Sequence, residues 1–580
     1  MNQTRSFLIF AWLAVATMLF MAWSRDNAAP ASAAVEGAVP AAVDAGDSTV
    51  PSVARDATTG VPAVPAAPVA GMSAPTQPGA ATQRPAVTVT TDVLRVVLDG
   101  GNVRQADLLR YPQTTDAGSD PMRLFASDAA TFFQAQSGWV SSTGGAPSHE
   151  AGFAPVGAQR AYALTDGADT VEVPFQWTGA DGVSIRRTYT FTRGHYAVQV
   201  RDEVVNAGSQ PWLGYVYRQL VRVPPVIETG FTKPESYSFH GAAWFSTGDK
   251  FEKRKFDDFI DDGPLDKSVT GGWIGMLQHH FFAAWIPGAT DESRFSIDSP
   301  RGAGGQQQAL IRELGPGLNV APGASASTSA RLWVGPKLVG QIESQQVPGL
   351  ERAVDFSSYG VMAWLAGLLF SVLSFLHGVF GNWGWAIIGL VVIIKALMFP
   401  LSAAQYKSAA KMRRFQPRIE QLKERYGDDK QKFQMAMMEL YKKEKINPVG
   451  GCLPLLVQMP VFLALYYTLL ESVELRQAPW IGWIQNLTAP DPYFILPAIN
   501  IAVMFATQKL TPTPIADPMQ RKMMQYMPVA MGVMFAFFPA GLVLYWVTNG
   551  SLGLLQQWYM LRKYGDTPST GGSAKGAKPA

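Results

Sequence analysis

A long apolar segment with a single charge reads Gly384-Trp385-Ala386-Ile387-Ile388-Gly389-Leu390-Val391-Val392-Ile393-Ile394-Lys395-Ala396-Leu397-Met398-Phe399-Pro400. A bilayer is crossed by about 20 apolar residues that rise roughly 1.5 Å each, so this stretch predicts a membrane span. A lysine at the centre of such a helix costs roughly 2.5–3.5 kcal/mol on insertion scales. Lys395 therefore has two interpretations: its ammonium snorkels to nearby headgroups, or it belongs to a functional site.

The composition predicts a membrane protein with a large water-soluble insert. The chain has 580 residues, of which 47% are hydrophobic and only 16% are charged. The apolar residues concentrate in the first two dozen positions and after about residue 360. A chain of this length and pattern holds at least two domains. Its one cysteine, Cys452, excludes an intramolecular disulfide.

The N-terminal region predicts an anchor followed by a tether. Residues 1–26 contain the uninterrupted apolar run Phe7–Trp23, which reads as a cleaved signal peptide or a retained transmembrane anchor. The retained anchor is favoured because the nearest small-residue cleavage site lies far beyond the run. Residues 27–84 are rich in Ala and Pro without periodicity, which predicts a disordered linker.

The region 85–348 predicts an antiparallel β-sandwich, because short alternating runs rich in Val, Thr and Tyr are punctuated by Gly, Asn and Asp. No convincing catalytic constellation occurs in it. His279 and His280 are adjacent, so on a strand they would point to opposite faces and could not share a metal. The sequence does not decide whether this domain binds a carbohydrate or a partner protein.

The distribution of basic residues predicts the side of the membrane on which each segment lies. The segment 401–448 is predicted to lie in the cytoplasm because of its twelve basic residues. They are Lys407, Lys411, Arg413, Arg414, Arg418, Lys423, Arg425, Lys430, Lys432, Lys442, Lys443 and Lys445. If the β domain lies outside and both Val361–Phe380 and the Lys395 helix crossed the membrane, the basic segment 401–448 would also lie outside. The two helices therefore cannot both cross. We therefore expect 349–382 to carry an amphipathic helix in the outer interface.

The remainder predicts a helical core. Residues 383–562 form a five-span unit, which with the anchor gives six spans and places both termini in the cytoplasm. Beyond the Lys395 helix, the expected spans are Leu453 to Glu471, Tyr493 to Thr507, Met524 to Phe538 and Gly541 to Leu561, the last two joined by Pro539-Ala540. Segment 401–448 is expected to fold as a helical hairpin broken at Gly427-Asp428. Residues 563–580 form a disordered cytoplasmic tail.

Several spans carry polar residues that should face protein or water. They include Gln458, Tyr466, Tyr467, Thr468, Tyr545, Thr548, Asn549 and Ser551. Each alone is typical of contacts between helices, but together with Lys395 they could line a water-filled groove. No acidic residue lies deep in the last four spans, so a buried ion pair with Lys395 is not available from them. Neither a phosphate-binding loop nor a zinc signature is present.

A set of ordered motifs resembles the YidC family of membrane protein insertases, of the Gram-negative type with a large periplasmic domain. The match is dense over 380–562 and looser over 86–340. The motifs are Asn382-Trp383-Gly384, Lys395 before Met398-Phe399-Pro400-Leu401, Gly427-Asp428-Asp429-Lys430-Gln431, Asn447-Pro448-Val449-Gly450-Gly451-Cys452, Gln458-Met459-Pro460, Phe462-Leu463-Ala464-Leu465-Tyr466-Tyr467, Val473-Glu474-Leu475-Arg476-Gln477-Ala478-Pro479, Asp517-Pro518-Met519-Gln520 and Gly541-Leu542-Val543-Leu544-Tyr545.

The resemblance implies an insertase and chaperone for newly made inner-membrane proteins, acting alone or with the Sec translocon through a hydrophilic groove with one positive charge. The implied groove residues are Lys395, Gln458, Tyr545, Trp546 and Asn549, and the implied hairpin residues are Gly427, Asp428 and Asp429. Lysine at 395 stands where Gram-negative members usually have arginine, which keeps the charge but loses the bidentate fork.

The resemblance also implies partners and a location. The partners would be nascent membrane proteins, the Sec translocon with its accessory subunits, the ribosome and anionic lipids. The location would be the bacterial inner membrane, with the β domain in the periplasm. After Arg562-Lys563 the tail carries only Lys575 and Lys578, which puts tail-assisted ribosome docking in doubt.

Two alternatives belong to other classes. One is a secondary transporter for a small anion, which predicts inverted repeats that the sequence lacks. The other is a membrane-anchored sugar enzyme formed by the β domain, which leaves five spans without a role. We expect no enzymatic activity, no cofactor and no metal.

Overall fold

The computed structural model describes residues 85–227, 238–259, 263–302, 304–354, 356, 360–403, 416–426, 429–443, 453–510 and 518–564. The predicted anchor 1–26, the linker 27–84 and nearly all of the tail 563–580 lie outside these residues, as do Gly427 and Asp428. The described residues divide into two compact units. We call 85–371 with 464–489 the β unit, and 372–463 with 490–564 the helical unit.

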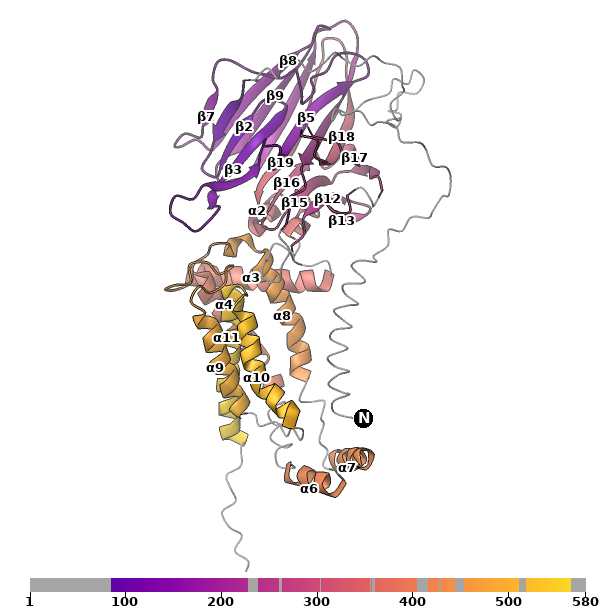
Figure 1. Ribbon diagram of the computed structural model, residues 1–580. Helices are drawn as coiled ribbons and strands as arrows, with labels where there is room; N and C mark the ends of the chain where they lie inside the picture. The colour runs from indigo at the N-terminus through magenta and orange to yellow at the C-terminus, as the bar shows by residue number, and fades with distance from the viewer. Residues whose placement is uncertain are drawn as a thin grey trace, which may run out of the picture. The chain divides into compact units, whose positions relative to one another are not determined.

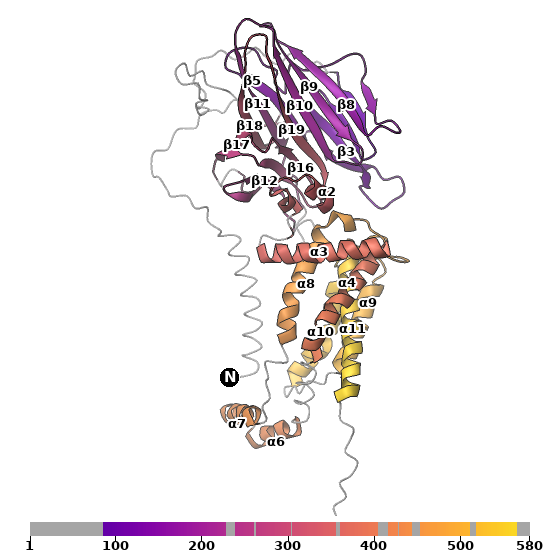
Figure 2. The ribbon, with the colours of Figure 1, turned by 180° about the vertical axis from the view of Figure 1, so that it is seen from behind.

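The β unit contains two layered sheets, which confirms the predicted sandwich (Figures 1 and 2). The first sheet has the order β14 (Asp266–Thr270), β17 (Glu292–Asp298), β18 (Ala309–Val320), β11 (Trp212–Arg222), β5 (Phe133–Ser141), β3 (Asn102–Pro112), β2 (Leu94–Leu98), β1 (Val87–Thr90) and β7 (Ala161–Ala163), with β4 (Pro121–Phe125) paired to β3. One pair, β1 with β7, is parallel, so the sandwich is not purely antiparallel as expected.

The second sheet is antiparallel throughout its printed pairings. Its order is β13 (Lys250–Lys255), β12 (Gly241–Ser246), β15 (Trp273–Leu277), β16 (Phe281–Ile286), β19 (Ser325–Pro336), β10 (Ala197–Asn206), β9 (Val183–Thr192), β8 (Thr170–Thr178) and β6 (Ala154–Pro155). Residues of β10 alternate between buried and exposed positions, as expected for a strand with one face in a core. Fully buried aromatic side chains fill the space between the sheets, among them Trp139, Trp212, Trp273, Trp285 and Trp333.

Helices follow the last strand. The region predicted as sandwich up to 348 ends with α2 (Val339–Ser344), and the 3-10 helix η2 (Leu350–Val354) comes next. Segment 464–489, which the sequence assigned to the membrane core, clusters with the β unit. It holds the C-terminal half of α8 (Leu453–Glu471) and the 3-10 helix η4 (Val473–Leu475).

The helical unit holds α4 (Trp383–Leu397), the first half of α8, α9 (Ile495–Leu510), α10 (Pro518–Phe535) and α11 (Ala540–Tyr564). α11 packs against α4 and α9, and α9 packs against α10. The connection predicted as Pro539-Ala540 is longer, because α10 ends at Phe535 and residues 536–539 form the turn. Pro539 lies just before the first residue of α11, where its missing N–H costs no helical hydrogen bond.

The segment predicted for the interface forms α3 (Gly360–Phe380). By length and composition, α3 is the one helix in the described part of the chain that is long and apolar enough to cross a membrane, whereas α4 and α9 are shorter. α3 and α4 are joined by Gly381 and Asn382. Gly381 has a φ of 65°, and the rings of His377 and Trp383 stack 4.0 Å apart across this turn. From Val372 onward, α3 runs crosswise to α4, α9, α10 and α11 (Figures 1 and 2).

Two further helices lie within the segment 401–448 for which a hairpin was expected. They are α6 (Gln416–Tyr426) and α7 (Lys430–Lys443), and they pack on each other. Asp429 precedes α7 and accepts a hydrogen bond from the backbone N–H of Lys432 through Oδ1 at 3.1 Å. This is an N-cap, in which a side-chain oxygen satisfies one of the unpaired N–H groups of the first turn. The described member of the predicted hairpin residues thus has a structural role.

Candidate functional site

Lys395 lies in the last turn of α4. The helix begins at Asn382, whose Oδ1 accepts hydrogen bonds from the backbone N–H groups of Gly384 (2.9 Å) and Trp385 (3.3 Å). The Lys395 side chain is half-buried, and no carboxylate among the described residues forms an ion pair with it. A cation in the last turn is favourably placed against the negative end of the helix dipole.

Gly553 of α11 faces the ammonium of Lys395. A Cβ built on Gly553 would lie 3.5 Å from Lys395 Nζ, which is ordinary van der Waals contact. A Cβ on Gly550 would instead lie 2.9 Å from Val503 Cγ1 on α9. The two glycines therefore have different neighbours: Gly550 allows α11 and α9 to approach closely, and Gly553 lies against the ammonium of Lys395.

One turn before Gly553, Asn549 joins α11 to α8. Gln458 Nε2 donates to Asn549 Oδ1 at 3.0 Å, and both side chains are half-buried. Asn549 and Gly553 are four residues apart on one helix, so they share a face. The structure thus brings polar residues of α8 and α11 together and places Lys395 beside the next turn of the same face.

Aromatic residues lie on the same face, one turn further toward the start of α11. The rings of Tyr545 and Phe462 stack with centroids 6.1 Å apart, and Phe462 meets Trp546 edge-on at 5.0 Å. Tyr545 is only 2% exposed, so its ring is enclosed by neighbouring side chains. The indole Nε1 of Trp546 is buried and has no hydrogen-bond partner among the described residues.

These contacts form three successive layers along α11. From the start of the helix they are Tyr545 with Phe462, Asn549 with Gln458, and Gly553 with Lys395. The first layer is aromatic, the second is a pair of hydrogen-bonded amides, and the third places the ammonium of Lys395 against the backbone of α11 at Gly553. We call this arrangement the layered face. Along it, a cation, a pair of amides and aromatic rings follow one another at intervals of one helical turn.

Sequence reasoning missed two members of the layered face, Phe462 and Gly553. A signal for both exists in the spacing. Phe462 follows Gln458 by four residues, and Tyr545, Asn549 and Gly553 follow one another at the same interval. The sequence alone does not tell which face of α11 meets α4. The position of Gly553 beside Lys395 therefore could not be predicted from it.

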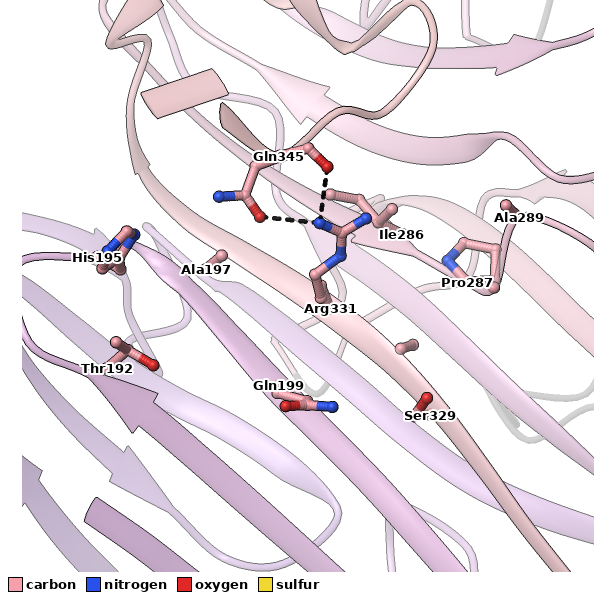
Figure 3. Close-up of a pocket in the computed structure, with 12 residues that line it drawn as sticks. Thr192, His195, Ala197, Gln199, Ile286, Pro287, Ala289, Ser329, Arg331 and Gln345 are labelled. Carbon is pink, nitrogen blue, oxygen red and sulfur yellow. Dashed lines mark hydrogen bonds between the residues drawn. The ribbon is translucent and has the colours of Figure 1, made fainter. Parts of the chain in front are cut away.

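The β unit carries a separate groove of about 380 Å³ (Figure 3). Arg331 lies in it and donates from Nη1 to the backbone O and to Oε1 of Gln345, each at 3.0 Å. The groove is lined by Thr192, His195, Ala197, Gln199, Ile286, Pro287, Gly288, Ala289, Ser329, Ala330, Arg331 and Gln345. No group of three or more residues able to hold a metal ion occurs among the residues that the structure describes.

Two families match this chain. The family described as 60Kd inner membrane protein matches residues 375–567, and the YidC periplasmic domain matches residues 86–372. The chain is 56% identical over 570 residues to the membrane protein insertase YidC of Stenotrophomonas maltophilia (strain R551-3), covering 98% of each chain. It is 55% identical to the YidC of Xanthomonas euvesicatoria pv. vesicatoria (strain 85-10), covering 98% of this chain and 99% of the relative. A solved structure of an active YidC insertase covers 82% of this chain and 92% of its own, with 18% identity and a TM-score of 0.37.

Proposed function

The chain belongs to the YidC family of membrane protein insertases, which are not enzymes, and we propose that the layered face receives its clients. The observation that carries the proposal is the alignment of Lys395, Asn549 and Tyr545 with their partners along α11. Lys395 attracts acidic groups of a client's polar tail, and Gln458 with Asn549 provides hydrogen bonds. The client helix then leaves along α8 and α11 into lipid.

The energy of insertion comes from the client and from the membrane. Burying apolar client surface contributes about 25 cal/mol per Å². An acidic tail that crosses outward gains roughly 2.3 kcal/mol per charge per 100 mV of inside-negative potential. No nucleotide is required. The Sec translocon, the ribosome and anionic lipids are the proposed partners beyond the nascent client itself.

The proposed topology has six spans, both termini in the cytoplasm and the β unit in the periplasm. α3 is long enough to cross, but a crossing α3 would place the twelve basic residues of 401–448 outside. The crosswise course of α3 from Val372 onward supports a position in the outer interface (Figures 1 and 2). Its exposed apolar residues, Trp364, Leu368 and Phe375 among them, would then contact lipid.

Site-specific crosslinking of a stalled nascent chain tests the proposed route. Photoreactive probes at positions 458 and 549 should crosslink a client whose polar tail has been taken up. A probe at Val533 of α10, which is exposed and lies on another helix, is the matched control. We expect several-fold stronger crosslinks from the two positions on the layered face. Equal crosslinking at Val533 would contradict a client route along α8 and α11.

Gly553 provides a second test of the site. Alanine fits at 3.5 Å from Lys395 Nζ, so Gly553→Ala should insert clients nearly as well as the native chain. Gly553→Leu should cover the ammonium and slow insertion of clients with acidic tails roughly tenfold, the equivalent of about 1.4 kcal/mol of lost attraction. Insertion rates in proteoliposomes measure both.

A double-mutant cycle separates this effect from a general packing defect. In a Lys395→Ala background, no charge remains to be covered, so Gly553→Leu should add little further loss. If the two substitutions instead slow insertion independently, Gly553 acts through helix packing and not through access to Lys395.

A further inference from the structure

The C-terminal end of α8 is bound by the β unit through two histidines. The last carbonyls of a helix lack intrahelical partners. The backbone O of Leu470 is one of them, and it lies 2.9 Å from His279 Nε2 and 3.1 Å from His280 Nε2. Because a carbonyl oxygen only accepts, both imidazoles donate from Nε2 to its two lone pairs.

The turn between β15 and β16 makes this possible and corrects the expectation that the two side chains oppose each other. Gln278 N donates to Phe281 O at 3.0 Å, so His279 and His280 are the two central residues of a tight turn, where the alternation of a strand does not apply. Their rings stack with centroids 3.7 Å apart and planes at 21°. Both therefore present Nε2 to the same acceptor.

Further contacts continue from the end of α8 into η4. Glu471 lies 3.8 Å from the ammonium of the fully buried Lys337, and its Oε1 accepts from Ser238 Oγ at 2.8 Å. Glu474 Oε1 accepts from the backbone N–H of Val339 at 3.2 Å. Each of these partners lies outside 464–489, in the part of the β unit before residue 371.

The loop after η4 is held by backbone carbonyls of β3 and the turn after it. Arg476 Nη1 donates to Pro112 O at 2.9 Å, and Gln477 Nε2 donates to the same oxygen at 3.1 Å. The Arg476 guanidinium lies 5.6 Å from the ring centroid of Phe281, next to the histidine turn. The contacts on both sides of Glu471 thus form one continuous surface.

We propose that His279 and His280 form a paired cap, neutral at physiological pH, that fastens the outer end of α8 to the β unit and opens when the imidazoles take up protons. The strands of the β unit then hold the C-terminal half of α8, from residue 464 to Glu471. This assignment does not depend on the identity of the client or on the route of insertion.

The surroundings of the cap favour the neutral state. Burial lowers the pKa of His279 to about 3 and that of His280 well below its usual value, and neighbouring positive charge acts in the same direction. The hydrogen bonds to Leu470 O raise both pKa values and offset only part of this shift. Burial raises the pKa of Glu474 to about 7. The charged and titratable groups that face the cap and the adjoining contacts are His240, Lys337, Glu471, Glu474, Arg476 and Tyr111.

The signs of these shifts define the pH window. The histidines have lower pKa values when docked, so docking is at full strength above about pH 6.5 and weakens as the pH falls, by up to tenfold per histidine per pH unit. Glu474 has the opposite sign, because its carboxyl is protonated more readily when docked. It therefore offsets part of the histidine effect between about pH 4.5 and 7.

Hydrogen exchange in the full chain in lipid nanodiscs tests the proposal. Glu474→Gln keeps the acceptor for Val339 and removes the opposing titration, so it is the reference chain. In it, the amides of 472–478 and of Val339 should lose roughly a hundredfold protection between pH 7.5 and 5.5, after correction for the intrinsic pH dependence of exchange.

Two substitutions at the cap give the decisive comparison. In the reference chain, His279→Gln with His280→Gln keeps amide donors that do not titrate, so protection should be the same at both pH values. His279→Leu with His280→Leu removes the donors and should lose protection already at pH 7.5. His195→Gln alters an exposed histidine of the same unit and should behave as the reference. Protection of the leucine variant equal to the reference, or a reference chain indifferent to pH, would overturn the proposal. Amides of β10 report that each variant is folded.

Discussion

Replacing Lys395 with alanine is expected to slow the insertion of clients with acidic tails by on the order of tenfold to a hundredfold. Two unit charges about 4–5 Å apart at an effective dielectric constant of about 20 attract each other by roughly 3–4 kcal/mol, part of which is offset by loss of hydration. Lys395 forms no ion pair with a carboxylate among the described residues, and its ammonium lies beside Gly553 of α11. The prediction rests on the proposal that this charge attracts a client carboxylate.

Insertion assays in proteoliposomes, with client pairs that differ only in tail charge, measure this effect. Lys395→Arg keeps the charge and should retain most of the activity, because the site is proposed to need a point charge and not a bidentate fork. Clients with uncharged tails should be slowed much less by Lys395→Ala. Undiminished insertion of acidic-tailed clients by the alanine variant would reject the role of the charge.

Much of the β unit could be predicted from local pattern. Alternation of apolar and polar residues indicates strands such as β9 and β10, because each has one face in the core. The parallel pairing of β1 with β7 could not be predicted, since it joins segments about 70 residues apart and leaves no trace in either. The stacked histidines were missed because a turn was read as a strand.

The layered face was predictable in its residues but not in its arrangement. Lys395 was recognisable because a charge in an apolar span is costly, and Gln458 and Asn549 because they are polar in the same setting. Their mutual contact depends on how α8 and α11 are rotated, which the sequence does not encode locally. Gly553 has no side chain, so nothing in the sequence marks it as a neighbour of Lys395. Its position beside the ammonium is known only from the structure.

The association of 464–489 with the β unit also could not be predicted, because it depends on contacts between residues far apart in the sequence. Hydropathy places Leu453 to Glu471 in the membrane, and the structure does form a helix with these bounds. Yet Leu470 and Glu471 contact His279, His280 and Lys337, which are more than 100 residues away. Such contacts arise from packing between distant segments, and they explain why a carboxylate stands at the end of an otherwise apolar helix.

The largest expected effect on stability lies in the centre of the sandwich, at Arg187. Its side chain is fully buried on β9 and pairs with Asp202, the residue opposite it on β10. The guanidinium donates to both Asp202 oxygens at 2.8 and 2.7 Å, to Ser137 O at 2.9 Å and to Gly100 O at 3.2 Å. The same carboxylate accepts from Trp139 Nε1 at 2.7 Å. One buried cation thus joins four segments of the two sheets.

Arg187→Ala should lower the free energy of unfolding of the β unit by about 3–5 kcal/mol, because it leaves the Asp202 carboxylate buried without its counter-ion. Urea unfolding of the full chain, followed through exchange of the β9 and β10 amides, measures the loss. Arg186, the preceding residue of the same strand, is exposed, so Arg186→Ala should change stability by no more than about 0.5 kcal/mol. The double variant Arg187→Leu with Asp202→Leu removes both charges and should cost less than Arg187→Ala alone. A double variant that is as unstable as the sum of its parts would show that the packing of Arg187, and not the uncompensated charge of Asp202, determines the effect.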